Sequence, residues 1–543
     1  MKKYRVWIVV GAVLLALIVL VASASSQTPL VARASDMWSR GHIIGQTPVK
    51  RRVALRAAPD GSVFLIWPNM AGRLELAHVG TDGEVLLRRV LPVEAREARD
   101  PKLHIGASGR LHLLWREGDY PNSTLLHVLL EADGTPVSQP WTLSDPRTLI
   151  LDAPCMVAGA DGRYHVVWAD EVGVQWAVLD AGGTLLVGPT ALASTGRFPA
   201  ARVDGQGRVH LIWQQRPRTG VESLYYGVLD PESGVLSGPE EVAQIVVRTG
   251  QGLGEPVIGL TPDMVYILWV VRDFQYVASS GEYISFPVGF PQQGRVESLR
   301  LRQGRYPDGM YAMEGVGTPL LVALDASVPD PEVADVVRSQ IAVIALGQGE
   351  GEEQVVTAST QASVRPVLVA DDRSNLHMAW LESTDFGEYR VVYASTAPGV
   401  MESYNALTLW DVVNAVFGSV FRLSTLVVAL VAVLIMWGGL PFLVLVVYHL
   451  ITSEETLNTV RSRGALVIAL ALEVTLTYIQ PPRIGVQADW PALRWVAPAV
   501  AAVVAALVLL RFVRGRRYFH LFAAYFLFVG VNSVLQMLMY FLL

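Results

Sequence analysis

The chain has 543 residues, of which 52% are hydrophobic and 17% charged, and 43 Lys and Arg residues stand against 49 Asp and Glu residues. Soluble domains carry about 25% charged residues, so the deficit points to the long apolar stretches at both ends, and the length excludes a single small domain. The one cysteine, Cys155, excludes a disulfide framework, a zinc site made of several cysteines and a CxxC redox pair.

Residues 1–25 are interpreted as a signal peptide or an N-terminal transmembrane anchor, and the sequence leaves both open. Lys2, Lys3 and Arg5 form a positive start, and residues 6–24 are apolar for long enough to cross a bilayer. Either interpretation places the next segment outside the cytoplasm. Residues 6–414 hold 31 basic and 45 acidic residues, a net charge of −14, which argues against nucleic acid as a partner.

An internal repeat fills the middle of the chain. Its copies end in runs such as Gly-Arg-x-His-x-x-Trp, and the tryptophans are Trp67, Trp115, Trp168, Trp213, Trp269 and Trp380. Their spacings are 48, 53, 45 and 56 residues and then 111, so one copy within the last interval has lost its tryptophan. Its second strand is expected near 320–324. The sequence thus predicts seven copies with a mean period of about 52 residues.

Each copy is predicted to form four antiparallel strands. Apolar and polar residues alternate up to each tryptophan, and Gly-rich turns separate the strands, which excludes helical repeats. This pattern predicts an all-β seven-bladed propeller over residues 35–396, with six blades as the alternative. The last copy stops after its third strand near Ser395, and we predict that Asp36–Gln46 supplies the missing strand and closes the ring.

The repeat pattern Asp-x-x-Gly-x-x-His-Φ-x-Trp, followed by a Tyr-rich strand, resembles the sialidase-type (BNR-like) propeller repeats of bacterial surface proteins over about residues 50–396. The resemblance implies the fold alone, because the Asp-box pattern Ser-x-Asp-x-Gly-x-Thr-Trp of the enzymes is absent. Arg197-Phe198-Pro199 is similar to the Arg-Ile-Pro segment that supplies a substrate-binding Arg in sialidases. Other copies carry in the same slot Arg99-Asp100-Pro101 and Val364-Arg365-Pro366. We therefore interpret this slot as a repeat position.

Histidine is also repeated, three positions before the tryptophan. It recurs as His112, His165, His210 and His377. Side chains three apart on a strand point to opposite faces, and a repeated position is spread around a ring, so we expect packing roles and no metal site. The six repeat tryptophans are interpreted as core between blades. No phosphate-binding or dinucleotide-binding motif is present, and no cofactor is predicted.

Four apolar stretches follow the repeats, at about 421–450, 464–480, 492–511 and 518–541. We predict a four-helix transmembrane domain over 421–543, joined to the propeller by a linker at 397–420. If the first stretch crosses once, the Arg-rich loops near 461–463 and 511–517 lie in the cytoplasm, as the positive-inside rule requires. The expected location is the cell membrane, with several crossings and the propeller on the extracytoplasmic side.

One ionisable residue interrupts these apolar stretches. Glu473 lies mid-span, where a charged group is costly. Asn532 and Gln536, four residues apart on the last helix, share a face and are its candidate partners, and His449 is another. The cluster could serve as a proton or ion relay, or as a hydrogen bond that fixes helix packing.

These features favour a membrane-tethered binding or scaffold protein that recognises a protein or glycan at the outer face of a bacterial envelope, with membrane lipid as its other partner. The alternatives are a sialidase-like glycoside hydrolase and a subunit of a transport or export complex. No spacing singles out paired carboxylates, so no catalytic residue is predicted. Arginines with an acid and a Tyr at the axial mouth would favour the enzyme, and a bare mouth with an apolar flank would favour a partner protein.

Overall fold

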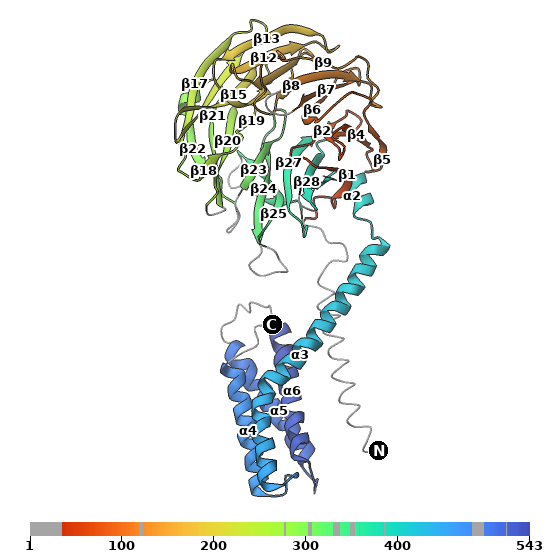
Figure 1. The fold of residues 1–543 in the computed structure, drawn as a ribbon, viewed down its shortest axis with the longest axis vertical. Coiled ribbons are helices and arrows are strands. Elements are labelled where there is room, and N and C mark those ends of the chain that lie inside the picture. The colour runs from red at the N-terminus through yellow and green to blue at the C-terminus, as the bar shows by residue number, and fades with distance from the viewer. Residues whose placement is uncertain are drawn as a thin grey trace. The chain divides into compact units, whose positions relative to one another are not determined.

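The computed structural model describes residues 35–118, 123–275, 278–301, 307–329, 337–347, 353–357, 359–384, 387–479, 493–516 and 518–542. Two compact units appear, one over Ala32–Ala406 and one that includes Leu407–Leu543 (Figure 1). The segment 1–25, interpreted as a signal peptide or anchor, lies outside the described residues.

The first unit is a ring of seven antiparallel sheets, termed blades 1 to 7 in chain order (Figure 1). Blade 1 contains β2 (Ala54–Ala57), β3 (Val63–Pro68), β4 (Leu74–Val79) and β5 (Val85–Val90). Blade 2 contains β6 (Arg99–Ile105), β7 (Leu111–Glu117), β8 (Thr124–Leu130) and β9 (Trp141–Thr142). Blade 3 contains β10 (Cys155–Ala158), β11 (Tyr164–Ala169), β12 (Val174–Leu179) and β13 (Leu185–Ala193). Blade 4 contains β14 (Arg197–Val203), β15 (Val209–Arg218), β16 (Val221–Leu229) and β17 (Leu236–Val246).

The remaining blades follow the same order with local variations. Blade 5 contains β18 (Gln251–Leu253), β19 (Val257–Leu260), β20 (Met264–Asp273), β21 (Ala278–Pro287) and β22 (Arg295–Ser298), with the short 3₁₀ helix η1 (Pro291–Gln293) before β22. Blade 6 contains β23 (Pro307–Ala312), β24 (Leu320–Pro329), β25 (Val337–Leu346) and β26 (Gln354–Val355). Blade 7 contains β27 (Ser363–Ala370), β28 (Leu376–Ser383), β29 (Tyr389–Ser395) and, from the start of the chain, β1 (His42–Thr47). The seven-bladed propeller is confirmed, and the six-bladed alternative is excluded.

The repeated tryptophans fill the space between blades. All six indole rings are buried, with exposed fractions of 0–3%. Trp115 of blade 2 packs with Phe64 and Ile66 of blade 1. Trp269 of blade 5 packs with Tyr226 of blade 4 in the same way. Because each ring contacts the preceding blade, one repeated residue type builds the interfaces around the ring.

The ring is closed by the start of the chain, as expected. β1 pairs antiparallel with β29, with His42 opposite Tyr393 and Thr47 opposite Tyr389. Arg40 Nε donates to the carbonyl of Tyr404 and its backbone N–H donates to Asn405 Oδ1, both at 2.9 Å. Blade 7 therefore holds both chain connections of the propeller.

The chain leaves the propeller through a short structured segment. Helix α2 (Pro398–Tyr404) packs on the propeller, where the Tyr404 hydroxyl donates to the carbonyl of Gly83 at 2.6 Å. Helix α3 (Leu409–Thr452) begins at a capping box between Thr408 and Asp411. The segment 397–420, predicted as a linker, contains α2 and the first turns of α3, because Pro398 and the Thr408 cap each start a helix there.

The described part of the second unit contains four packed helices. They are α3, α4 (Val460–Ile479), α5 (Leu493–Val513) and α6 (Leu521–Leu542). Helix α3 passes through Pro441 without a break, which excludes a hairpin within the first apolar stretch. The two loops at one end pair with each other, since the Leu457 N–H donates to the carbonyl of Phe519 at 3.0 Å.

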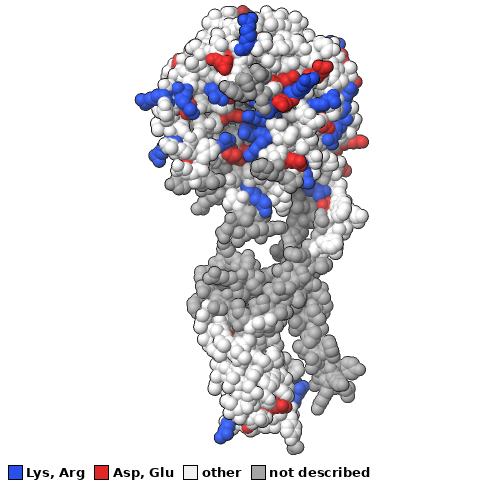
Figure 2. All heavy atoms as spheres, in the orientation of Figure 1, with Lys and Arg blue, Asp and Glu red and all other residues white. Residues whose placement is uncertain are grey.

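The described side chains make up apolar stretches of different length on the four helices. Among residues whose side chains are described, Val460–Ile479 and Val496–Val513 are long and apolar enough to cross a membrane by length and composition. The apolar parts of α3 and α6, Gly438–Thr452 and Leu521–Gln536, are shorter. Two candidate spans are therefore found where four were predicted. Figure 2 shows that charged side chains on the visible face of this unit gather at one end.

Candidate functional site

Two connected cavities lie on the axis of the propeller. The deeper one, of about 120 Å³, is lined by residues from the innermost strands of all seven blades. The other, of about 300 Å³, is lined by the beginnings of first strands, the segments before them and the ends of second strands. This second cavity is termed the axial mouth, and its charged and aromatic side chains are those of Arg51, Arg116, Asp152, Arg197, Phe198, Glu255 and Arg272. Its volume is at the lower end of the range for small-molecule sites.

The repeated position just before the recurring proline places side chains at the mouth. In three blades, the residue before the proline that recurs in the repeats has a positive φ. These residues are Asp100 (52°), Phe198 (51°) and Arg365 (58°). A β-bulge interrupts the strand register at each of these positions. Non-glycine residues rarely adopt this conformation, and a following proline disfavours helical backbone angles. The backbone is therefore strained at each of these three positions.

The mouth opens at the end of the propeller opposite its chain connections. The residues of the mouth lie before or at the beginning of first strands, or near the end of second strands. Gly83, which binds Tyr404 of α2, lies in the turn between the third and fourth strands of blade 1, at the other end of that sheet. The chain segment that leads to the helical unit therefore starts on the face away from the mouth.

Positive charge is in excess in the lining of the mouth. Four arginines and two carboxylates line it, in a segment whose overall charge is strongly negative. Arg197 forms a bidentate pair with Asp152, with both N–O distances at 2.8 Å. Arg116 is held by the buried carboxylate of Asp100 at 2.9 Å. Such pairs fix the planar guanidinium groups in orientation while leaving donors directed at the cavity.

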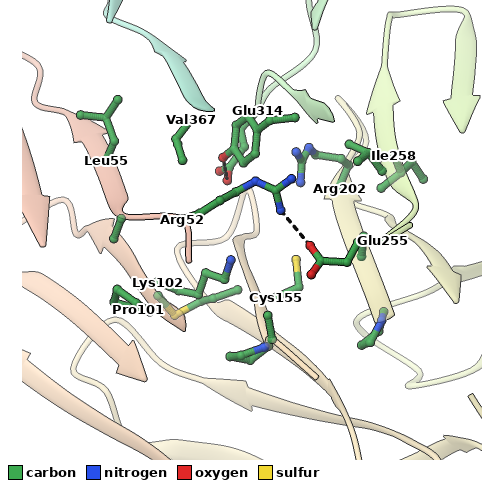
Figure 3. Close-up of a pocket in the computed structure, with 18 of the residues that line it drawn as sticks. Arg52, Leu55, Pro101, Lys102, Cys155, Arg202, Glu255, Ile258, Glu314 and Val367 are labelled. Atoms are coloured by element: carbon green, nitrogen blue, oxygen red, sulfur yellow. Dashed lines mark hydrogen bonds and ion pairs between the residues drawn. The ribbon is translucent and has the colours of Figure 1, made fainter. Parts of the chain in front are cut away.

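Glu255 is the common partner of three more arginines. Its carboxylate lies 3.0 Å from Arg52, 3.7 Å from Arg51 and 3.9 Å from Arg365. Burial works to raise the pKa of Glu255, but the three guanidinium groups outweigh it and lower that pKa to about 2. Figure 3 shows Arg52 reaching across the cavity to Glu255, which comes from the opposite wall.

A second polar layer crosses the channel deeper along the innermost strands. Arg56, four residues or about 13 Å along β2 from Arg52, contacts Glu314 and lies 2.9 Å from His104 Nε2. The Tyr311 hydroxyl donates to Glu314 at 2.9 Å. Burial and the neighbouring Glu314 raise the pKa of Tyr311, whereas Arg56 and Arg202 lower the pKa of Glu314 against the effect of its burial.

Lys102 and Cys155 complete the lower wall, as Figure 3 shows. Burial raises the pKa of the Cys155 thiol, so the thiolate needed for nucleophilic chemistry is disfavoured. Among the described residues, no group of three or more His, Cys, Asp or Glu side chains is arranged to hold a metal ion.

The repeated histidines are buried in the blades and are not among the residues that line the two axial cavities. His210 Nδ1 lies 2.7 Å from the Tyr226 hydroxyl, and His377 repeats this contact with Tyr393 at 2.7 Å. The same layer contains His112 and His165, with exposed fractions of 0% and 1%. His165, His210 and His377 therefore stabilise their own sheets, whereas His112 Nε2 lies 3.2 Å from the carbonyl oxygen of Ala181 and links blade 2 to blade 3.

The polar residues singled out in the helices are brought together. Asn532 Nδ2 donates to Glu473 Oε1 at 2.8 Å, and Gln536 Nε2 donates to Asn532 Oδ1 at 3.2 Å. All three side chains have no exposed surface. His449 takes another partner, since its Nδ1 lies 3.2 Å from the carbonyl oxygen of Glu454.

The axial arginines are the residues that sequence reasoning missed. The slot before the innermost strand was interpreted as a repeat position, and it is one, but it lies beside the ring axis. There the side chains of several copies meet. The signal available was the recurrence of Arg in that slot, at Arg52, Arg99, Arg197 and Arg365.

No family model matches the chain, and no curated protein does. Solved structures with similar folds include the polysaccharide lyase Uly1, which is 10% identical over 64% of this chain and 90% of its own, with a TM-score of 0.44. An ulvan lyase of family PL25 is 10% identical over 64% and 95%, with a TM-score of 0.45. An α-L-arabinanase from Penicillium chrysogenum is 13% identical over 68% and 98%, with a TM-score of 0.38. The likeness concerns the propeller fold, and the sialidase-type repeat resemblance extends no further than that fold.

Proposed function

We propose that this protein is a membrane-tethered binding protein whose propeller recognises an anionic, carboxylate-bearing saccharide at the axial mouth. The observation that carries the proposal is the convergence of four arginines on an open 300 Å³ cavity in an otherwise acidic propeller. A carboxylate matches the planar fork of a guanidinium group, and the hydroxyls of a sugar suit the remaining donors and acceptors.

The carboxylates of the mouth support binding more than catalysis. Glycoside hydrolysis needs one carboxyl group that can donate a proton. Glu255 has its pKa lowered to about 2, and Asp152 accepts two hydrogen bonds from Arg197. Both act as fixed acceptors that orient arginines, which is the role expected in a recognition site.

A sialidase-like hydrolase is the second candidate, favoured by one observation. Tyr311 and Glu314 form a hydrogen-bonded pair in the deeper cavity, below the arginines. A tyrosine nucleophile would need a base to take its proton, and Arg56 keeps Glu314 ionised while lowering its basicity. The raised pKa of Tyr311 further disfavours its phenolate. These opposing effects place the hydrolase second.

The membrane tether rests on the helical unit. Val460–Ile479 and Val496–Val513 can cross a bilayer by length and composition. The loops between α3 and α4 and between α5 and α6 meet at one end, and the arginines near that end are Arg461, Arg463, Arg511, Arg514 and Arg516. The positive-inside rule would put this end in the cytoplasm, and a single crossing by α3 would then put the propeller outside.

Glycan binding by the full-length protein in nanodiscs tests the proposal. An array should carry glucuronate- and sialate-bearing oligosaccharides beside the same glycans with their carboxyl groups reduced to alcohols. We expect binding to the acidic glycans alone. Arg116→Gln and Arg197→Gln should each weaken it about tenfold or more, because a charge-assisted hydrogen bond contributes about 1.5–3 kcal/mol.

Arg163→Gln is the matched control, since Arg163 pairs with Asp161 in a turn at the opposite end of blade 3. Equal binding of carboxyl-reduced glycans, or an equal loss in Arg163→Gln, would refute recognition at the mouth. Cleavage of a bound glycan that is lost in Tyr311→Phe would instead establish the hydrolase.

A further inference from the structure

The polar chain in the helical unit is directed toward a single carboxylate. Gln536 donates to Asn532, and Asn532 in turn donates to Glu473. The Asn532 amide therefore presents its positive end to the Glu473 carboxylate, and the Gln536 amide does the same to Asn532 Oδ1. Hydrogen bonds of this direction favour negative charge on that group.

Nothing in the described part of the chain balances that charge. Within it, no Lys, Arg or His lies within salt-bridge distance of Glu473. Glu473 Oε2 and Gln536 Oε1 are buried acceptors without a hydrogen-bond partner there, and the same holds for the hydroxyl of Ser533. Buried polar atoms are paired in almost all native structures, so these unpartnered oxygens need an explanation.

The titratable groups of the neighbouring helices are engaged elsewhere. On α6, Tyr525 lies close enough to Glu473 to interact with it electrostatically, but its hydroxyl donates to the carbonyl of Gly438 at 2.6 Å. On α3, the described groups Tyr448 and His449 bind within the loop that follows. On α5, Arg511 occupies the last turn.

A carboxylate without exposed surface is strongly disfavoured unless a counter-charge or a proton neutralises it. We propose that Glu473, Asn532 and Gln536 form a binding site for one small monovalent cation, a proton or Na⁺, inside the helical unit. The ligand joins the Glu473 Oε2 atom and completes the coordination of the free acceptors. A static hydrogen bond between helices would need no unpartnered carboxylate oxygen.

The position of Glu473 suits exchange with water. It lies six residues, or about 9 Å, before the end of α4 at Ile479. That is within reach of the boundary of a bilayer about 30 Å thick, yet the side chain itself has no exposed surface. The distance from the carboxyl group to that boundary is therefore short, whereas its burial keeps it out of contact with bulk water.

Carbodiimide labelling of the full-length protein in nanodiscs tests the site. Dicyclohexylcarbodiimide is apolar and reacts with a protonated carboxyl group. The acid proton passes to a carbodiimide nitrogen, the carboxylate oxygen bonds to the central carbon, and the O-acylisourea rearranges to a stable N-acylurea. We expect an N-acylurea on Glu473, found by mass spectrometry of peptides, and a yield that falls as the pH rises.

Two arms distinguish the ligands. If the site takes Na⁺, labelling at fixed pH falls when NaCl replaces choline chloride. If it takes only a proton, the two salts give the same yield and the pH dependence remains. Asn532→Leu removes the donor that favours the charged form, so the pH of half-maximal labelling should rise by about one unit or more.

Thr475→Val is the matched control, because Thr475 is exposed on α4 and binds only the carbonyl of Ala471. It should leave the labelling curve unchanged. Absence of labelling at Glu473 from pH 5 to 9, or a yield that responds to neither pH nor Na⁺ nor Asn532→Leu, would overturn the proposal and leave a packing contact.

Discussion

The Arg52 guanidinium group lies 3.0 Å from the Glu255 carboxylate, although 203 residues separate the two and they belong to blades 1 and 5. In a ring of seven, these blades face each other across the axis. The pair therefore spans the channel, and with Arg51 and Arg365 it ties three blades to one carboxylate.

Loss of this carboxylate should cost stability. Glu255→Gln leaves three guanidinium groups close together without their shared counter-charge, and we expect a loss of about 1–3 kcal/mol in the free energy of unfolding. Urea titration followed by tryptophan fluorescence measures it. Glu131→Gln breaks the exposed pair with Arg110 and should change stability by less than about 0.5 kcal/mol. Equal effects of the two substitutions would contradict the role assigned to Glu255.

The strained slot before proline gives an unusual order of stabilities. At Phe198, φ is 51°, which costs any residue with a Cβ about 1 kcal/mol and costs glycine nothing. Phe198→Gly and Phe198→Ala remove the same ring, so we expect the glycine variant to be more stable by about 1 kcal/mol. Chemical denaturation of both variants decides this. An alanine variant at least as stable as the glycine variant would show that the position is unstrained.

Acid should destabilise the propeller before its carboxylates titrate. Burial lowers the pKa of His112 and His165 to about 4 and that of His127 to about 3. As the pH falls below 6.5, these histidines bind protons in the unfolded chain but stay neutral in the folded state. The free energy of unfolding therefore decreases between about pH 6.5 and 4. Each contributes up to about 1.4 kcal/mol per pH unit.

Thermal unfolding across this pH range measures the effect, and His165→Gln should flatten the dependence by about one proton. At lower pH a separate loss is expected from Glu255, whose lowered pKa stabilises the fold above about pH 4.5 and ceases to do so as the pH falls toward 2. A stability that stays constant between pH 6.5 and 4.5 would contradict the buried neutral histidines.

The tryptophan interfaces predict a large penalty for truncation. Trp213 is 1% exposed and packs with Val157, Val167 and Trp176 of the preceding blade. Trp213→Ala should therefore destabilise the propeller by about 3–5 kcal/mol in urea. Phe274→Ala, at a ring that is 67% exposed, is the control and should stay within about 0.5 kcal/mol. A neutral Trp213→Ala would remove this residue from the core.

Most of the propeller fold could be predicted from the sequence because the residues of its core recur periodically. Tryptophan spacing predicted seven blades, and the absent fourth strand after Ser395 predicted the closing role of β1, which pairs with β29. These features depend on hydrophobic alternation and strand count, which are local properties of the chain. Blade 6 could be predicted although it lacks the repeated tryptophan, because β24 keeps the apolar pattern at Leu320–Pro329.

The site could not be derived in the same way. Two repeated positions looked equivalent in sequence, the histidine before the tryptophan and the residue before the proline. In space the first is spread around the blades, whereas the second borders the axis, where Arg52, Glu255 and Arg365 meet. Side chains at a repeated position meet only if that position lies close to the propeller axis. Spacing along the chain does not give the distance from the axis.

The helical region shows a similar limit. Composition predicted four apolar helices, and four helices form, of which Val460–Ile479 and Val496–Val513 are candidate spans among the residues whose side chains are described. Helix existence follows from local composition. The number of crossings depends on how each helix sits in lipid, which composition does not fix.

The pairing of β1 with β29 has a consequence for synthesis. His42 is translated 351 residues before its partner Tyr393, and at about 5–20 residues per second the delay is roughly 20–70 s. During that time β1 has no partner strand, and the nascent ring has two unpaired strand edges to which another chain could bind. A chain released before the end of the last repeat could not close the ring, so synthesis of β29 is the step that commits the propeller to its closed form.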